Sequence, residues 1–194
     1  MRGDVGIAPY ILSVRVSGHN NYALKRGVTM RLRPYIPSHD FDAIKDWITD
    51  ERTHAMWSAK HAPYPLEKNA FDVFLADMYT KHGDCPFVAT ADDGKVVGFI
   101  CCGINIETGE SMLAFVLIDP AQRGKGYGKE MIQLAAKYCF EMLKADAVQL
   151  NVFTANERAR KCYESAGFTE RHTTPDAFPY GDEMWGRCNM IMKK

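Results

Sequence analysis

A short glycine-rich stretch between an apolar run and a helical pattern offers the clearest chemistry in this sequence. Residues 115–118 are apolar and partly β-branched, as in a buried strand, and Asp119-Pro120 ends that run. The next residues, 123–128, read Arg-Gly-Lys-Gly-Tyr-Gly, and the helical pattern begins almost at once. Glycines let the backbone approach a ligand closely, and the free N–H groups at a helix start attract anions. The stretch therefore predicts a phosphate or pyrophosphate site.

Two familiar phosphate-binding motifs do not fit this stretch. A Walker A loop needs Ser or Thr after its lysine to bind Mg²⁺, but Lys129 is followed by Glu130. A dinucleotide fingerprint needs Gly-x-Gly-x-x-Gly and an acidic residue about 20 positions later at the end of a strand. This chain has Gly-x-Gly-x-Gly, and Asp146 precedes its predicted strand.

A second block, downstream of the glycine turn, favours a third interpretation of the phosphate site. Residues 156–168 read Asn-Glu-Arg-Ala-Arg-Lys-Cys-Tyr-Glu-Ser-Ala-Gly-Phe. Together, the 118–128 and 156–168 segments resemble the GNAT superfamily of acyl-CoA-dependent N-acetyltransferases. The first matches the pyrophosphate motif Gln/Arg-x-x-Gly-x-Gly/Ala, and the second matches an Asn, a short helix bearing Tyr, and a Gly-Phe ending. The resemblance covers about residues 30 to 192. Trp57 and Pro63-Tyr64-Pro65 resemble the branch that includes ribosomal-protein N-terminal acetyltransferases.

The resemblance implies where coenzyme A binds. The strand before the glycine turn would splay from its neighbour and pair with pantetheine through its backbone. The implied contacts are Val116, Ile118, Arg123, Gly124, Lys125, Gly126, Tyr127, Gly128, Lys129 and Asn156. Val116 and Ile118 can also be plain core residues, and Asn156 can be a helix N-cap, a role compatible with binding.

The resemblance also implies two catalytic groups. Tyr163 would protonate the leaving thiolate, because a phenol and a thiolate have similar basicity in a dry site. The other interpretation is a half-buried tyrosine that packs on the sheet. The N–H of Val116 would polarise the thioester carbonyl. No metal is expected, and the six histidines lack the ligand spacing of a structural zinc site.

The acceptor half of the reaction is harder to locate. Four residues are candidates for the general base: Glu51, His54, Glu107 and Glu110. We expect residues 51–64 and a loop at 175–185 to wall the acceptor pocket. In that loop, Phe178, Tyr180 and Trp185 would supply aromatic surface, while Asp176, Asp182 and Glu183 would attract a cationic amine unless they are merely solvated.

These residues predict an acetyl-CoA-dependent N-acetyltransferase that acts directly on a primary amine. The amine belongs either to a small molecule or to a protein N-terminus. The alternative is a non-catalytic acyl-CoA-binding module that senses the cofactor or regulates a partner. Such a module would keep the glycine turn and Asn156 but would not need Tyr163.

Composition bears on the partners and the cellular location of the protein. The formal net charge of the 194 residues is zero, which does not suggest a nucleic-acid partner. No apolar run reaches the roughly 18 residues of a membrane helix, and the N-terminus does not resemble a signal peptide. The six cysteines form no Cys-x-x-Cys pair and fall mostly in apolar patterns, which predicts a reducing, cytoplasmic location.

Periodicity predicts one α/β domain of the α+β type at 30–194. Strands are expected at 30–33, 87–90, 95–106, 112–118, 147–153, 168–173 and 184–192, and helices at about 40–48, 51–57, 66–83, 126–143 and 156–165. Ser38 or Asp40 would cap the first helix. The resemblance implies that these strands form one mostly antiparallel sheet flanked by helices. Residues 1–29 are either an appendage or an extra edge strand, which could pair with the sheet or with a second subunit of a homodimer.

Overall fold

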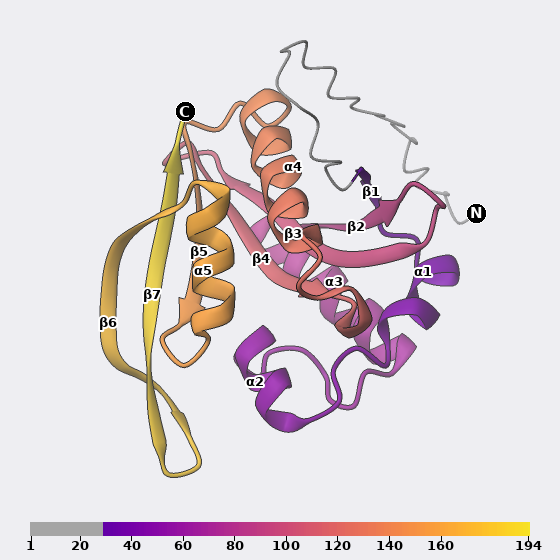
Figure 1. The fold of residues 1–194 in the computed structure, drawn as a ribbon, viewed down its shortest axis with the longest axis horizontal. Coiled ribbons are helices and arrows are strands. Elements are labelled where there is room, and N and C mark those ends of the chain that lie inside the picture. Colours follow the sequence, from indigo (N-terminus) through magenta and orange to yellow (C-terminus); the bar gives the residue numbers. More distant parts are fainter. Residues whose placement is uncertain (1–28) are drawn as a thin grey trace, which may run out of the picture.

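The fold is a single mixed sheet with helices on both faces (Figure 1). We describe residues 29–194 of a computed structural model, so the predicted extension 1–29 lies almost wholly outside the described part. The elements in chain order are β1 (Met30–Pro34), α1 (Pro37–Ile44), α2 (Glu51–Ser58), α3 (Lys68–His82), β2 (Cys85–Ala91), β3 (Val96–Asn105), β4 (Glu110–Ile118), a 3₁₀ turn (Pro120–Gln122), α4 (Tyr127–Glu141), β5 (Ala147–Phe153), α5 (Glu157–Ala166), β6 (Thr169–Tyr180) and β7 (Glu183–Lys193).

The sheet confirms the predicted mixed, mostly antiparallel topology. Its seven strands run in the order β1-β2-β3-β4-β5-β7-β6. Only β4 and β5 are parallel, and α4 connects them as the crossover that parallel strands require. The other neighbours are antiparallel, and β2 and β3 join through a turn in which Gly94 adopts a φ of +82°.

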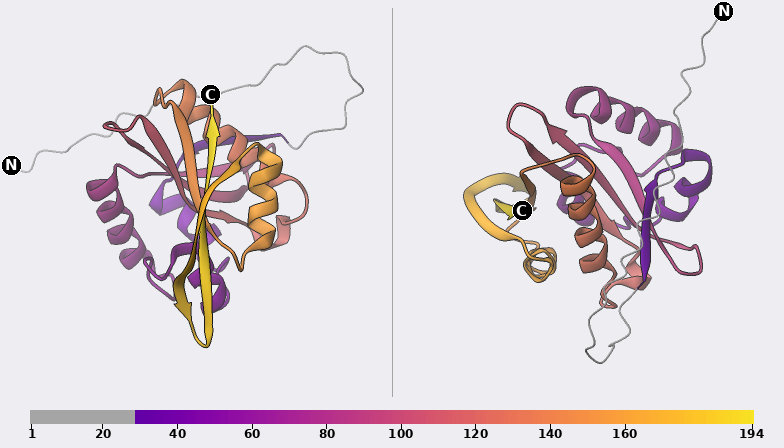
Figure 2. Two further views of the ribbon diagram at one scale, coloured as in Figure 1. Left: turned by 90° about the vertical axis from the view of Figure 1, so that its left-hand side faces the viewer. Right: turned by 90° about the horizontal axis from the view of Figure 1, so that it is seen from above.

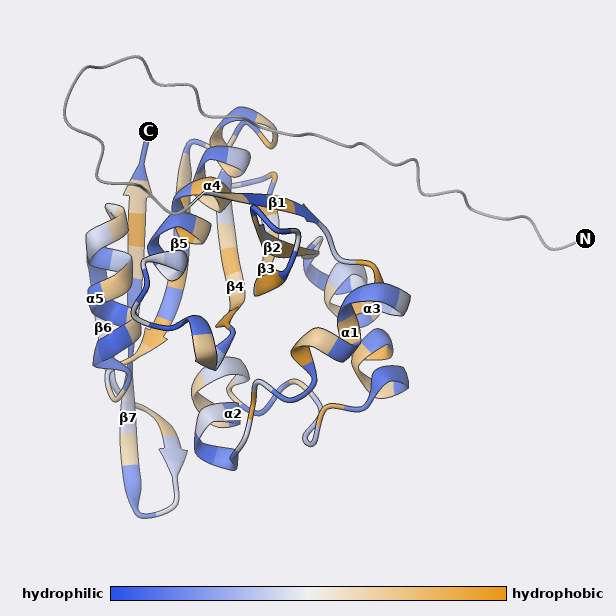
Figure 3. Ribbon diagram, turned by 45° about the vertical axis from the view of Figure 1, so that its right-hand side comes forward, coloured by the Kyte–Doolittle hydropathy of each residue, from blue (hydrophilic) through white to orange (hydrophobic). Residues whose placement is uncertain are grey.

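Two cores lie on opposite faces of the sheet. Figure 2 (right) shows α4 on one side and α1 and α3 on the other. The α4 core contains Met131, Ile132 and Leu150, while the α1–α3 core contains Phe71, Phe99 and further aromatic rings. β3 lies between both cores and is buried over its first eight residues, and hydrophobic residues concentrate in β3 and β4 (Figure 3).

Glycines end two helices as their positions predicted. Gly83 closes α3 with a φ of +71°, and Gly167 closes α5 with a φ of +111°. Both lie in the left-handed region, where a side chain would be strained. Within residues 29–194, no helix is long and apolar enough to span a membrane.

The first helix corrects two predictions. Neither Ser38 nor Asp40 caps α1 at its start: the N-cap is Ile36 and no side chain caps it. α1 also ends at Ile44, so Trp47 and Ile48 lie beyond the helix, although both are buried in the α1–α3 core. A local pattern shows that these residues are buried, but not that the helix stops before them.

Asp40 has a different role from the predicted cap. It is fully buried, and its carboxylate accepts hydrogen bonds from both terminal nitrogens of Arg33 on β1, at 2.6 and 2.7 Å. It also accepts from the backbone N–H of Ile36 at 2.8 Å. This pair ties α1 to the edge of the sheet.

Replacing Asp40 should therefore destabilise the fold. Burial on its own would raise the pKa of Asp40, but the hydrogen bonds from Arg33, His39 and Ile36 outweigh it and lower that pKa. The carboxylate thus stabilises the fold above its ordinary pKa, and this contribution is lost as pH falls through the lowered value. Asp40→Asn should cost about 3 kcal/mol at pH 7 in urea unfolding, and the difference from the wild type should shrink towards pH 3.

The matched control is Asp42→Asn. Asp42 forms an exposed pair with Lys45 on the same helix, so its loss should change the free energy of unfolding very little. Equal losses in the two variants would show that Asp40 is no special anchor.

Candidate active site

A cleft opens where two neighbouring strands separate. β4 and β5 pair in parallel only where Glu110–Leu113 of β4 lies beside Ala147–Leu150 of β5. Both strands continue beyond this pairing, β4 to Ile118 and β5 to Phe153. The cleft between the unpaired ends encloses about 590 Å³. It is lined by both strands, by the start of α4, by α5, and by Thr53, Met56 and Trp57 of α2. The expected splay of the cofactor strand is present in this geometry.

A bulge in β4 lies at the edge of the cleft. The β3–β4 register passes from Phe99–Leu117 to Cys101–Ala114, so neither Phe115 nor Val116 has a register partner. Phe115 has a φ of +51°, an unusual conformation for a bulky residue. Its ring packs edge-on against Trp57 and Phe74, at centroid distances of 5.9 and 5.1 Å. This packing holds the strained backbone in place.

Val116 and Ile118 lie between the cleft and the core. Each lines the cleft, and each also packs against the α4 core. Beyond Leu113, β4 has no partner in β5, so this stretch of its backbone is available to a ligand.

The glycine turn forms one end of the cleft. Gly124 and Gly126 adopt φ values of +81° and +92°, and Gly126 is the N-cap of α4, with no side-chain cap. A Cβ atom at Gly124 would meet nothing within 4 Å, so the turn leaves space beside its backbone. The uncapped first turn of α4 faces this space with its N–H groups, which suits an anion.

The third glycine has a different role. A Cβ atom at Gly128 would lie 3.1 Å from the Sγ atom of Cys162, so Gly128 permits the close contact of α4 with α5. Two other predicted ligands do not line the cleft. Lys125 donates a hydrogen bond to Gln122 at 3.0 Å, and Tyr127 packs against the α4 core. Arg123, Gly124, Gly126, Gly128 and Lys129 do line it.

Two cations of α5 complete the charge around the cleft. Arg158 and Lys161 line it together with Arg123 and Lys129. Partial burial lowers the pKa of Arg123, and the charge of Arg158 lowers it further. Arg123, Lys129 and Arg158 form no ion pair within residues 29–194. The four cations suit a ligand with several phosphate charges.

The sequence prediction missed Arg158 and Lys161, although their spacing gave a signal. They follow Asn156 at positions that place both on one side of a helix starting at Glu157. Asn156 itself is the N-cap: its Oδ1 accepts from the N–H of Ala159 at 3.2 Å while the residue lines the cleft.

Tyr163 lies on α5 at the inner part of the cleft. It is 8% exposed, packs within the α4 core and lines the cleft. Burial raises the pKa of its phenol, so Tyr163 stays protonated throughout the ordinary pH range. In the described part of the chain its hydroxyl has no hydrogen-bond partner. It is therefore a free proton donor.

None of the four residues considered as a general base lines the cleft. Glu110 is paired with Arg171, and Glu51 and Glu107 are exposed elsewhere. His54 is buried, with its Nε2 atom 2.9 Å from the carbonyl oxygen of Ala62, and its ring stacks on Tyr64. The lining residues include no Asp, Glu or His. The lining of the cleft therefore offers no carboxylate or imidazole as a general base.

The expected acceptor loop at 175–185 is a hairpin instead. β6 extends to Tyr180 and β7 begins at Glu183, so the turn consists of Gly181 and Asp182 alone. The prolines at 175 and 179 suggested a loop, but β6 is an edge strand, where proline is tolerated.

The hairpin packs against α2, but only α2 lines the cleft, so residues 175–185 do not form the expected second wall. Phe178, Tyr180 and Trp185 form a cluster with Ala55 and Met56. Arg52 of α2 donates to both carboxylate oxygens of Glu183, and the hydrogen bonds from Arg52 and Trp185 lower the pKa of Glu183 to about 2. Glu183 is thus already neutralised by Arg52 and is not free to attract an amine. Asp176 and Asp182 are exposed and do not line the cleft.

Within residues 29–194, no three His, Cys, Asp or Glu side chains are grouped so as to hold a metal ion.

Comparison with known proteins gives one consistent result. Aminoglycoside N(6')-acetyltransferase type 1 of Klebsiella pneumoniae is 23% identical over 162 residues, which cover 77% of this chain and 78% of that protein. Spermidine N(1)-acetyltransferase of Vibrio cholerae is 33% identical over 113 residues, covering 55% of this chain and 65% of that protein. The fold matches the crystal structure of the Vibrio cholerae spermidine N-acetyltransferase in complex with CoA and spermine. The TM-score is 0.72 at 20% identity, over 84% of this chain and 95% of that one.

The sequence model of the acetyltransferase (GNAT) family matches residues 41–168, which is more than half of the chain and spans the cleft from α2 to α5. The chain therefore belongs to the GNAT family of acetyl-CoA-dependent N-acetyltransferases.

Proposed function

We propose that this enzyme transfers the acetyl group of acetyl-CoA to the primary amine of a small molecule, within the cleft between β4 and β5. The observation that carries the proposal is that one cleft contains an unpaired strand edge, a cationic glycine turn and a buried, protonated tyrosine. The similar aminoglycoside and spermidine enzymes support a small-molecule amine rather than a protein N-terminus.

The donor half of the cleft would bind acetyl-CoA in one orientation. Arg123, Lys129 and Arg158, with the first turn of α4, would bind the pyrophosphate end of acetyl-CoA. The backbone of Val116 and Ile118 would pair with the pantetheine arm as a missing strand would, and Asn156 would contact the same arm. This arrangement would put the thioester at the inner end of the cleft, towards Tyr163.

Tyr163 would act as the general acid. The amine nitrogen attacks the thioester carbonyl carbon, the N–H of Val116 stabilises the developing negative charge on oxygen, and the C–S bond breaks. The departing sulfur takes the phenolic proton of Tyr163. The phenol then regains a proton from the nitrogen of the new amide. The raised pKa of Tyr163 keeps this proton in place until the sulfur becomes basic.

The amine would lose its proton to solvent water and enter as a free base, because no Asp, Glu or His lines the cleft to take that proton. The six cysteines are free, which supports a reducing, cytosolic setting for the reaction.

Arg158→Gln should weaken coenzyme A binding about tenfold at low salt, because it removes a charged hydrogen-bond donor to phosphate. Isothermal titration calorimetry would measure this Kd, and pantetheine, which has no phosphate group, should bind the variant as it binds the wild type. Lys137→Gln, on the outer side of α4, is the control and should leave both affinities unchanged. An equal loss for pantetheine would contradict the phosphate role.

Tyr163→Phe should lower kcat about a hundredfold and leave the Kd for coenzyme A unchanged, because only the proton donor is lost. Release of free thiol during turnover with a panel of primary amines would measure kcat. The control is Tyr138→Phe, a half-buried tyrosine that packs on Phe87 outside the cleft. Unchanged turnover in Tyr163→Phe would remove the acid. Tight coenzyme A binding without turnover of any amine by the wild type would instead indicate a non-catalytic module.

The pH dependence of kcat/KM should reflect the pKa of the amine substrate and not that of a group on the enzyme. With no base in the cleft, kcat/KM should rise with pH and level off near the pKa of each amine used. Two amines whose pKa values differ by about 1 unit should therefore give profiles displaced by the same amount. A common midpoint near pH 6.5 for both amines would point to a histidine base such as His54, and a His54→Asn variant would then test that residue directly.

A further inference from the structure

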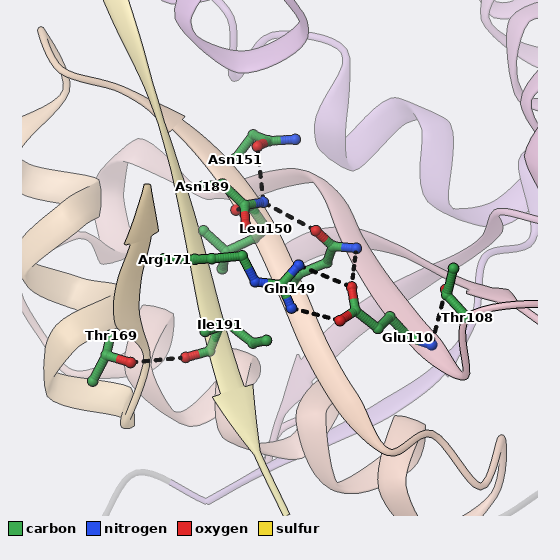
Figure 4. Close-up of polar contacts among 9 residues, drawn as sticks. All are labelled: Thr108, Glu110, Gln149, Leu150, Asn151, Thr169, Arg171, Asn189 and Ile191. Carbon is green, nitrogen blue, oxygen red and sulfur yellow. Dashed lines mark hydrogen bonds and ion pairs between the residues drawn. The ribbon is translucent and has the colours of Figure 1, made fainter. Parts of the chain in front are cut away.

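A chain of polar side chains crosses four strands and ends at the cleft (Figure 4). Arg171 of β6 donates to both carboxylate oxygens of Glu110 on β4. The Nε2 atom of Gln149 on β5 donates to the same carboxylate at 2.8 Å. Asn189 of β7 donates through its Nδ2 atom to Gln149 at 3.0 Å and to Asn151 of β5 at 3.1 Å. Glu110, one of the residues considered as a base, is thus part of this network.

The carboxylate of Glu110 fixes the direction of every bond in the network. The hydrogen bond from Arg171 lowers the pKa of Glu110, so this group only accepts hydrogen bonds. Gln149 must therefore turn its NH₂ group towards Glu110 and its oxygen towards Asn189. Asn189 must then act as a donor.

A backbone group confirms the orientation of Asn189 independently. Its Nδ2 atom lies 3.3 Å from the carbonyl oxygen of Leu150, which can only accept. The opposite orientation of this amide would bring its oxygen against three oxygen atoms. Asn189 keeps the observed orientation even though its own Oδ1 atom is buried without a partner among residues 29–194.

The orientation of Asn189 also fixes the orientation of the Asn151 amide. Its Oδ1 atom is occupied by Asn189, so its NH₂ group points away from the network (Figure 4). Within the described residues this NH₂ group has no hydrogen-bond partner. Asn151 thus presents a donor of fixed orientation.

Asn151 occupies a distinctive place in the cleft. It follows Leu150, the last residue of β5 that pairs with β4, so it lies where the two strands separate. Asn151 is exposed and lines the cleft. Its neighbours Leu150 and Val152 face the α4 core, which also contains Tyr163. Because side chains alternate along a strand, Asn151 faces the opposite side of the sheet.

We propose that Asn151 determines the specificity for the acceptor by donating a hydrogen bond to an oxygen atom of the amine substrate. This inference rests on the proposed function, because it assigns the cofactor to the side of α4, α5 and Tyr163 and the acceptor to the other side. A hydroxyl, ether or carbonyl oxygen near the attacking nitrogen can accept such a bond. A protonated amine cannot, because it is itself only a donor. The acceptor class is therefore an oxygen-bearing primary amine, such as an amino alcohol or an amino sugar, in preference to a plain polyamine.

The test compares amines that differ in one atom. 2-Methoxyethylamine and n-butylamine have the same length, as do 3-methoxypropylamine and n-pentylamine, and only the ethers carry an oxygen acceptor. For each pair, kcat/KM of the ether divided by that of the alkylamine is measured for the wild type and the variants. Comparing these ratios between proteins cancels the different pKa values of the amines.

Asn151→Ala should lower the ether preference about threefold to tenfold in at least one pair, as expected for loss of one hydrogen bond between neutral groups. Asn151→Asp keeps the oxygen that accepts from Asn189 but replaces the donor with an acceptor. It should lower the ether preference further and favour 1,4-diaminobutane over n-butylamine. The control is Asn69→Ala, an exposed residue on α3, which should keep the wild-type ratios.

A binding measurement separates this inference from the proposed function. In the wild-type protein saturated with coenzyme A, the side-chain ¹⁵N–H₂ signal of Asn151, identified by its absence in Asn151→Asp, should shift on addition of 2-methoxyethylamine and not of n-butylamine. Unchanged ratios in Asn151→Ala, or a weaker Kd for coenzyme A with no change in the ratios, would overturn the role in acceptor specificity while leaving the enzyme intact. Absence of turnover by the wild type would overturn the proposed function, and an unmoved ¹⁵N signal would overturn the inference independently of turnover.

Discussion

The interruption of the β4–β5 ladder is the constraint from which the site follows. The two strands pair over four residues and then separate, so a run of backbone N–H and C=O groups on β4 lacks its neighbouring strand. Such groups must find other partners. The bulge at Phe115 lies in this unpaired stretch, and the rings of Trp57 and Phe74 pack against Phe115, whose φ is positive.

The separation of the strands also divides the chemistry between two faces of the sheet. On the face of α4 and α5 lie the glycine turn, the cations and Tyr163, whose burial keeps its proton in place. On the other face lie Asn151 and its network, with α2 and the β6–β7 hairpin nearby. A molecule held along β4 from the first face would expose its reactive end to the second. In the proposed function, the gap would supply both a binding edge and a passage between donor and acceptor.

The donor half could be predicted from sequence because its determinants are local. The turn at 123–128 carries its own glycines and helix start, and Asn156 precedes its helix directly. The acceptor half depends on contacts between distant segments, which no local pattern encodes. Arg52 neutralises Glu183 across 131 positions, and Arg171 engages Glu110 across 61. Proline content suggested a loop where an edge strand allowed a hairpin, whereas the spacing of Arg158 and Lys161 after Asn156 could have indicated their place beside the cleft.

The net charge of zero gives no sign of the cations around the cleft. They stand out only when the ion pairs of individual residues are considered. The chain has equal numbers of basic and acidic residues, and many of the described cations neutralise a carboxylate, often one turn away on the same helix, as Lys68 does with Asp72. Arg123, Lys129 and Arg158 have no such partner within residues 29–194, and they gather around one opening. Unpaired like charges repel one another, so holding them together costs stability unless an anion joins them. The cluster is therefore best explained by a polyanionic ligand, and its position at the open strand edge indicates how that ligand enters.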